Sequence, residues 1–168
     1  MGIKWAKVGD KLEKLPERKN LRLRDYDYSQ AGYYFITICT KDRENLFWEE
    51  ESIFNLGIGD LVLTNIGEII KRGINDINNH YKNVKVDKYV IMPNHIHLIL
   101  VLEGEMPKSP SVPRVIQQLK GIITKEVGFS IWQRSFYDQI IRNEKQYEEI
   151  WNYIDTNPLK WNEDKYYL

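Results

Sequence analysis

The sequence has little of what marks secreted and membrane proteins. Its single cysteine, Cys39, excludes an intramolecular disulfide framework and fits a reducing cytoplasm. No apolar run approaches the roughly 18 residues that a membrane span needs, and the first residues lack the apolar region of a signal peptide. The net charge is zero, with 24 basic and 24 acidic residues, so the composition as a whole gives no argument for nucleic-acid binding. We therefore expect a cytoplasmic protein that does not contact a membrane.

What the sequence contains is typical of one globular domain preceded by a basic arm. Hydrophobic residues make up 42% and charged residues 29% of the 168 residues, which is enough for a hydrophobic core. Residues 1–24 hold eight basic side chains against three acidic ones, a net charge of +5 that leaves −5 on the remainder. We predict a basic, partly helical N-terminal arm over residues 1–24 and a single domain over residues 25–168. Such arms can bind phosphate but are more often solvated termini.

Hydrophobic periodicity predicts five strands and three helices. The strands are expected at residues 33–40, 61–63, 84–91, 95–102 and 136–141, and the first is apolar enough for a central place in a sheet. The helices are expected at about residues 65–80, 112–128 and 144–157, with Thr64 and Asn143 capping the first and third. Strands 84–91 and 95–102 must be antiparallel because a short turn joins them. This order predicts an α+β fold, an antiparallel sheet covered by helices.

Two histidines stand one residue apart at the start of the strand at 95–102. Side chains alternate along a strand, so His95 and His97 project from the same face. Pro93 and Asn94 form the turn just before them. Two neutral imidazoles in one space can bind a divalent cation. A role as buried structural residues explains them equally well unless a third ligand lies elsewhere in the chain.

The third predicted helix carries polar groups that would complete such a site. At 100° per residue, Tyr153 and Asn157 lie one turn apart and flank the apolar stripe. From there a phenol and an amide oxygen can reach one metal-bound phosphate. Taken alone, the spacing is more typical of a rim tyrosine and a helix-terminal asparagine. The stripe itself consists of Tyr147, Ile150, Trp151 and Ile154.

An ordered set of motifs resembles a known family. Pro93-Asn94-His95-Ile96-His97 has the histidine–hydrophobic–histidine pattern of the HUH superfamily. Downstream, in matching order, follow Ile131-Trp132-Gln133-Arg134, Ile141-Arg142-Asn143 and Tyr153-Ile154-Asp155-Thr156-Asn157-Pro158. With residues 25–29 and 34–38, this set resembles the REP-associated tyrosine transposases, relatives of the single-tyrosine insertion-sequence transposases. The resemblance covers about residues 20–162, and residues 1–20 match no part of it.

The resemblance implies a fold, a metal site and a nucleophile. The fold would be an antiparallel sheet with flanking helices, close to a ferredoxin or RNA-recognition-motif arrangement. His95, His97 and Asn157 would hold Mg²⁺ or Mn²⁺, and Tyr153 would attack a DNA phosphodiester to give a 5′-phosphotyrosine and a free 3′-hydroxyl. Family substrates are single-stranded DNAs next to short hairpins, the repetitive extragenic palindromes. The chain is thus expected to be a nucleoid-associated transposase that acts as a monomer or homodimer.

Aromatic rings and cations alternate near the predicted site, a pattern that suits single-stranded DNA. Trp132, Arg134 and Arg142 are expected to stack on bases and pair with phosphates, and Lys120 on the second helix to add a phosphate contact. The alternative interpretation is that Trp132 belongs to the core and the arginines lie on a solvated rim.

Two other functions stay open. One is a catalytically silent module that holds hairpin DNA without cutting it. The other is a metal-dependent hydrolase that uses His95 and His97 with water, while Tyr153 is structural. The presence of both histidines, Tyr153 and Asn157 favours the tyrosine enzyme, because a silent module would be free to lose them. Only the tyrosine enzyme forms a covalent protein–DNA adduct.

Overall fold

The computed structural model describes residues 5–8, 11–14, 23, 26–54, 61–104 and 110–167. Its strands are β1 (Trp5–Val8), β2 (Lys11–Lys14), β3 (Gly32–Cys39), β4 (Val84–Ile91), β5 (His95–Leu102) and β6 (Tyr137–Ile141). Its α-helices are α1 (Glu50–Phe54), α2 (Asn65–His80), α3 (Val112–Val127) and α4 (Glu144–Thr156). Two 3-10 helices, η1 (Lys41–Arg43) and η2 (Asn157–Glu163), complete the elements.

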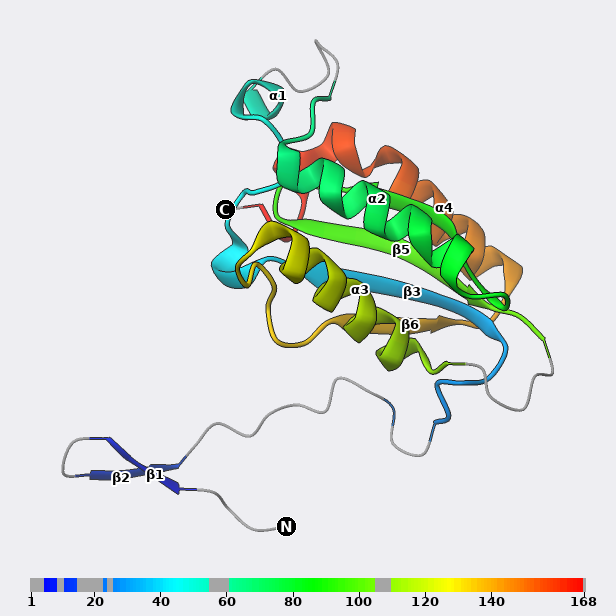
Figure 1. The fold of residues 1–168 in the computed structure, drawn as a ribbon, viewed down its shortest axis with the longest axis horizontal. Coiled ribbons are helices and arrows are strands. Elements are labelled where there is room, and N and C mark those ends of the chain that lie inside the picture. Colours follow the sequence, from blue (N-terminus) through cyan, green and yellow to red (C-terminus); the bar gives the residue numbers. More distant parts are fainter. Residues whose placement is uncertain are drawn as a thin grey trace.

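The main sheet is antiparallel and has the strand order β4-β5-β3-β6. Helices α2 and α3 cover one face, and α4 lies on the opposite face, against β4 and β5 (Figure 1). This arrangement is the predicted α+β fold, and β3 has the predicted central position. No helix among the described residues is long and apolar enough to cross a membrane.

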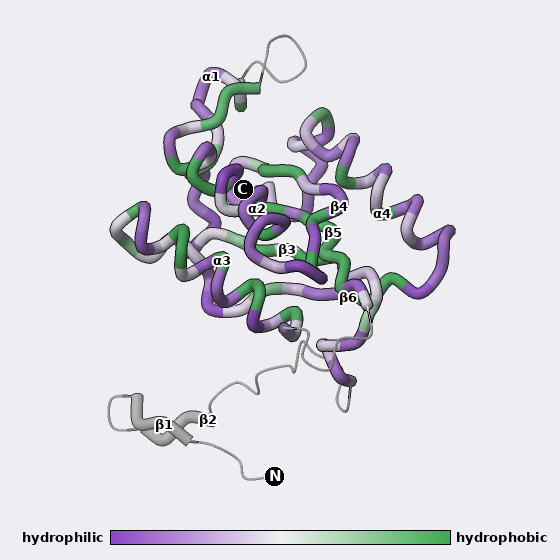
Figure 2. The backbone as a smooth tube through the Cα atoms, turned by 45° about the vertical axis from the view of Figure 1, so that its right-hand side comes forward, coloured by the Kyte–Doolittle hydropathy of each residue, from purple (hydrophilic) through white to green (hydrophobic). Residues whose placement is uncertain are grey.

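The sheet separates two hydrophobic clusters, because successive side chains of each strand point to opposite faces. The larger cluster joins the side chains of Ile96, Leu98 and Leu100 to α2 and α3. The smaller one joins Ile99 and Val101 to α4, where Tyr147, Ile150, Trp151 and Ile154 form the predicted stripe. In Figure 2 the hydrophobic segments follow the central strands, and the helices alternate between the two colours. The face that carries His95 and His97 is therefore the α4 face.

The hairpin β4–β5 has the predicted bounds and places the histidines at one end of the sheet. Its turn is closed by the Met92 N–H, which donates to the His95 carbonyl at 2.8 Å. Because β5 also pairs with β3, His95 lies opposite Cys39 and His97 opposite Thr37. Central placement buries both imidazoles completely.

Two predicted elements differ in the structure. Residues 61–63 form no strand of the sheet, and Leu63 makes only an isolated bridge to Trp48, since three residues offer too few ladder hydrogen bonds. The described part of the arm is not helical but forms the antiparallel pair β1–β2, consistent with the hairpin signal of Gly9 and Asp10 between the two segments. The boundary predicted at residue 25 lies outside the described residues.

The end of the third helix also differs from the prediction. Helix α4 ends at Thr156, and the chain continues as η2 instead of stopping at Pro158. Proline is tolerated in the first turn of a helix because its missing N–H would have no partner there. The chain therefore turns back towards the sheet over the next seven residues, and this reversal shapes the site.

Candidate metal and nucleophile site

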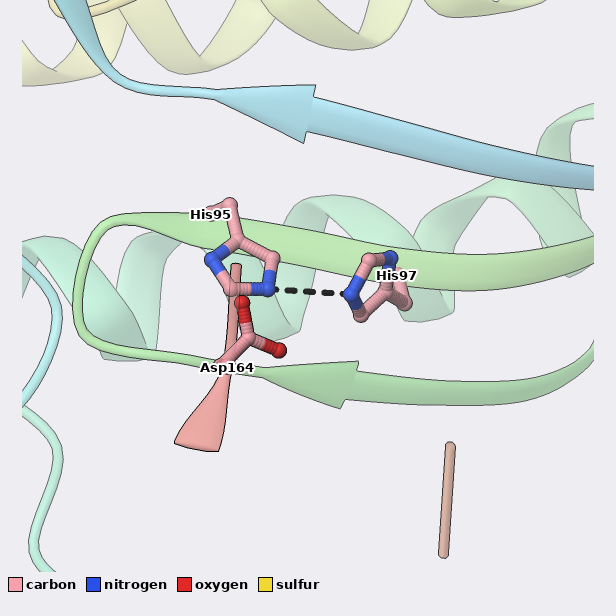
Figure 3. Close-up of side chains that lie close together, drawn as sticks. All are labelled: His95, His97 and Asp164. Carbon is pink, nitrogen blue, oxygen red and sulfur yellow. Dashed lines mark hydrogen bonds between the residues drawn. The ribbon is translucent and has the colours of Figure 1, made fainter. Parts of the chain in front are cut away.

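The two buried histidines of β5 point their outer nitrogens at one another. The Nε2 atoms of His95 and His97 are 3.0 Å apart (Figure 3). Two ligand atoms that sit at right angles around one ion, each about 2.1 Å from it, lie about 3.0 Å apart. The separation of the two nitrogens thus fits adjacent ligands of one divalent cation.

Asn94, the second residue of the Pro93-Asn94 turn, determines which ring nitrogen of His95 carries the proton. The Asn94 Nδ2 group donates to the carbonyls of Arg43 at 3.2 Å and Tyr166 at 2.9 Å. Its Oδ1 must therefore face His95 Nδ1, at 2.9 Å, and accept the Nδ1 proton. The Nε2 atom of His95 is left with a free lone pair, which is the form a metal binds.

His97 is held by the neighbouring strand β3. Its Nδ1 atom is 2.8 Å from the hydroxyl of Thr37, and its ring stacks on Phe35 with 5.2 Å between centroids. A hydroxyl can donate or accept, so His97 can carry its proton on Nε2, shared with His95, or on Nδ1. The second tautomer frees both Nε2 atoms for one ion.

Burial keeps both imidazoles neutral. It lowers the pKa of His95 from 6.5 to about 4, and the nearby charges of Asp164, Lys165 and Arg43 act less strongly. The pKa of His97 lies well below its ordinary value, because of burial first and then the charges of His95 and Lys165. Neutral imidazole is the metal-binding form.

The phenol of Tyr153, on α4, reaches the same point. Its Oη atom is 3.2 Å from His97 Nε2 and 3.3 Å from Asp164 Oδ2, and the side chain is 38% exposed. The exposed part faces a cavity of about 460 Å³. Burial and then the charge of Asp164 raise the pKa of Tyr153, while the amide of Asn157 lowers it in part. The phenol is therefore protonated at neutral pH and a weak nucleophile by itself.

Asn157, one turn beyond Tyr153, holds a buried amide without a partner. The residue is 3% exposed, and neither Oδ1 nor Nδ2 makes a hydrogen bond of regular geometry to the described residues, although the amide lies near enough to the Tyr153 phenol to lower its pKa. A buried polar group in this state costs about 1–3 kcal/mol. An ion or ligand in contact with the amide oxygen would offset that cost, and the role of Asn157 as a metal ligand stays a prediction.

The structure adds a carboxylate that the sequence motifs did not indicate. Asp164 follows η2, and one of its oxygens, His95 and His97 offer ligand atoms that all lie within 4.8 Å of one another. Figure 3 shows the carboxylate facing both imidazoles. No spacing rule links Asp164 to the histidines, because its position depends on the reversal of the chain through η2.

Two cations near the site were also not predicted. Arg43, from η1, and Lys165, beside Asp164, lie close enough to lower the pKa values of His95 and of Cys39. The guanidinium of Arg43 is 5.6 Å from the centre of the Tyr166 ring, and the Lys165 ammonium is 5.0 Å from it. They supply positive charge at the end of the sheet that carries the two histidines.

The predicted DNA contacts lie in different settings. Trp132 is 6% exposed and packs on Phe47, which favours its core role over stacking on bases. Lys120 donates its ammonium protons to the carbonyls of Gln133 at 2.6 Å and Arg134 at 3.3 Å, so it supports the segment that carries Arg134. Arg134 and Arg142 are exposed and remain predicted phosphate contacts.

Comparison with known proteins gives three relatives of similar length. An uncharacterized protein of Haemophilus influenzae is 33% identical and aligns with 90% of this chain and 93% of its own length. A putative REP-associated tyrosine transposase of the same organism is 25% identical over 80% of this chain and 74% of its own length. The REP-associated tyrosine transposase of Escherichia coli is 25% identical, and the match covers 79% of this chain and 70% of that protein. No profile of a known protein family matches the sequence.

A solved structure has the same fold. It is a REP-associated tyrosine transposase bound to a REP hairpin, with a TM-score of 0.60 and 23% identity. The match covers 86% of this chain and 76% of that one.

Proposed function

Because this chain is a homologue of proteins named REP-associated tyrosine transposases and has the fold of one, we propose that it cuts and rejoins single-stranded DNA beside a hairpin by means of Tyr153. The observation that carries the proposal is the meeting of a phenol with two metal-ligand nitrogens. Tyr153 Oη lies 3.2 Å from His97 Nε2, although 56 residues separate the two in sequence. Family members named in this way act as transposases, and one of them has been seen with a REP hairpin.

The metal-binding residues are His95, His97 and Asn157, all buried. When bound, Mg²⁺ or Mn²⁺ neutralises charge on the phosphate and on the leaving oxygen. Asn94 and Thr37 hold the two rings so that both Nε2 atoms face the same point. Asp164 raises the pKa of the phenol, and a cation held by these residues would offset that effect.

In the cleavage step Tyr153 Oη forms a bond to phosphorus as the phenol loses its proton to water, and an equal proton is later returned from water to the leaving oxygen. The bond between phosphorus and the 3′ oxygen breaks, and that oxygen takes up a proton to become a 3′-hydroxyl. The 5′-phosphotyrosine retains the energy of the phosphodiester, so a 3′-hydroxyl can rejoin without ATP. One Tyr153 per chain permits one cleavage at a time, so excision needs two sites or two rounds.

The positive groups around the site suit a DNA backbone. Arg43 and Lys165 border the histidines, and Arg134 and Arg142 are exposed cations of the segments that flank β6. Guanidinium groups pair with phosphate oxygens through charge-assisted hydrogen bonds. We expect these four side chains to guide the strand towards Tyr153, and the protein to act at the nucleoid.

The test is a covalent adduct with labelled single-stranded hairpin oligonucleotides and Mn²⁺, detected on a denaturing gel. The wild-type chain should give an adduct, and mass spectrometry should place the nucleotide on the peptide that holds Tyr153. Tyr153→Phe should form none while it still binds the oligonucleotide, because it loses one hydroxyl and keeps the ring. Tyr147→Phe, on the same helix, is the matched control and should form the adduct, since the Tyr147 hydroxyl donates to Asp87 instead.

Three results would contradict this proposal, each in a different way. An adduct that survives in Tyr153→Phe would move the nucleophile to another residue. Cleavage with no adduct would support the metal-dependent hydrolase. Tight hairpin binding without any cleavage, at all metal concentrations tested, would support the silent binding module.

A further inference from the structure

The C-terminal segment brings a carboxylate to the two histidines. Asp164 follows η2, and one carboxylate oxygen lies with the ligand nitrogens of His95 and His97 in a group whose members are all within 4.8 Å. It is the only such group of histidine, cysteine or acidic side chains in the described ranges. As Figure 3 shows, the carboxylate faces the space between the two rings.

Several contacts hold this carboxylate in place. The Tyr166 N–H donates to Asp164 Oδ1 at 2.7 Å, and the Tyr166 carbonyl accepts from Asn94. The Tyr166 ring lies 4.5 Å from that of His95. Upstream, Trp161 is buried and lies 6.0 Å from His95. Asp164 is thus fixed by its neighbours on both sides and is not a freely moving surface group.

The chemistry of the ion argues for a carboxylate ligand. Mg²⁺ and Mn²⁺ are hard cations that prefer oxygen, and protein sites for them usually include one or two carboxylates. His95, His97 and Asn157 supply two nitrogens and one neutral oxygen, and no negative charge. We propose that Asp164 is a further ligand of the ion held by these three residues. This inference rests on the metal site of the proposed function.

A ligand from the C-terminal segment has a consequence for that segment. The ion would join it to β5 and to the start of η2, so ion binding and the observed position of residues 164–167 stabilise each other. Four protein ligands in a six-coordinate site leave two positions for phosphate oxygen or water. The site therefore still accommodates the DNA that the proposed function requires.

Binding of Mn²⁺ to the whole chain without DNA tests the assignment directly. Calorimetric titrations compare the wild-type chain with Asp164→Asn, Glu163→Gln and His97→Ala. Asp164→Asn keeps an oxygen for the Tyr166 N–H, so the segment should stay folded while the Mn²⁺ affinity falls at least about tenfold. Glu163→Gln removes an exposed carboxylate one residue away, and should change the affinity by less than about twofold.

A second variant separates ligation from the effect of a nearby charge. Asp164→Cys places a soft thiolate at the same point, so the chain should bind Cd²⁺ more tightly than Mn²⁺ and show an ultraviolet thiolate-to-cadmium band. The wild-type chain, which retains the buried Cys39, should show no such band.

The outcomes distinguish this inference from the proposed function. Weaker Mn²⁺ binding in Asp164→Asn together with the cadmium band in Asp164→Cys supports ligation. If His97→Ala loses Mn²⁺ binding but Asp164→Asn does not, Asp164 is no ligand and the histidine site stands. Weaker binding without the cadmium band assigns Asp164 a charge effect only and overturns ligation. Wild-type chain that binds no Mn²⁺ would remove the metal site from the proposed function as well.

Discussion

At the scale of single residues, the site depends on side chains that are costly to bury. His95 and His97 are enclosed on β5, and Asn157 leaves both amide atoms without a partner among the described residues. Folded proteins retain such groups mainly where function needs them, because burial without a partner lowers stability. Two measurements on the metal-free protein expose this cost.

The first is a dependence of stability on pH. An unfolded chain takes up protons on its histidines as the pH falls through about 6.5, whereas burial lowers the pKa of folded His95 to about 4 and that of His97 further. The unfolded state thus binds more protons between these values, so the free energy of unfolding should fall as the pH drops from 6.5 towards 4. Urea unfolding at a series of pH values, in the presence of a chelator, measures this free energy.

Replacement of the histidines provides the control. The double variant His95→Gln and His97→Gln should lose most of this dependence, while His80→Gln, at an exposed position on α2, should keep it. Equal slopes in all three proteins would show that the two buried imidazoles are not the source.

The second measurement concerns Asn157. Asn157→Leu replaces an unpartnered buried amide with an apolar side chain of similar size, at a backbone position with helical angles. Without metal, the variant should be as stable as the wild-type chain or up to about 1–3 kcal/mol more stable. It should also need more Mn²⁺ for half-maximal adduct formation, because one oxygen ligand is missing. Thermal unfolding and a Mn²⁺ titration of activity check the two halves. A destabilised variant with an unchanged titration would make Asn157 a structural residue.

At the scale of elements, the start of α2 is packed against the loop after β3. A Cβ atom on Gly67 would lie 2.4 Å from the Phe47 carbonyl oxygen, so Gly67→Ala must push the helix away from the loop. We expect a loss of about 1–3 kcal/mol in the free energy of unfolding. Gly121→Ala, on the exposed side of α3 with open space around it, should instead stabilise by about 0.5–1 kcal/mol. Chemical unfolding of both variants measures the two changes in stability. Equal changes would contradict the close approach of Gly67 to the Phe47 carbonyl.

The elements also show how much the sequence can predict. The bounds of β4 and β5 followed from alternating apolar residues around a Pro-Asn turn, and the capping residues of α2 and α4 from local hydrogen-bonding chemistry. These signals are local, so they can be recognised in the sequence without knowledge of the fold. The prediction of a strand at residues 61–63 was wrong. A strand forms only where a partner strand accepts its hydrogen bonds, and the local sequence does not show whether such a partner is present.

The candidate site divides in the same way. Strand alternation alone places His95 and His97 on one face of β5, whereas the roles of Tyr153 and Asn157 came from the family resemblance, because their spacing alone is more typical of a rim tyrosine and a helix-terminal asparagine. Asp164 and Lys165 were not, because they reach the histidines only after the chain reverses through η2. Asn94 was predicted as a turn residue, and its role in orienting His95 depends on the Tyr166 carbonyl from the distant C-terminal segment.

At the scale of the whole molecule, one chain contains every group of the site. The sheet supplies the histidines, α4 supplies Tyr153, the first residue of η2 is Asn157, and the segment after η2 supplies Asp164. The contact of 3.2 Å between Tyr153 Oη and His97 Nε2 lies within a single chain. A tyrosine from one chain is therefore expected to work only with the histidines of the same chain.

Mixed proteins test this directly. One variant, His95→Ala, keeps the nucleophile but loses a metal ligand, and the other, Tyr153→Phe, keeps the metal site but lacks the nucleophile. Neither should form an adduct alone, and their mixture with the hairpin oligonucleotide and Mn²⁺ should form none either. A wild-type chain of different size, added to Tyr153→Phe, should carry all of the adduct in its own band. An adduct on the His95→Ala chain in the mixture would mean that the histidines of a second chain had served its tyrosine. Helix α4 would then exchange between two chains, and the working unit would be a dimer.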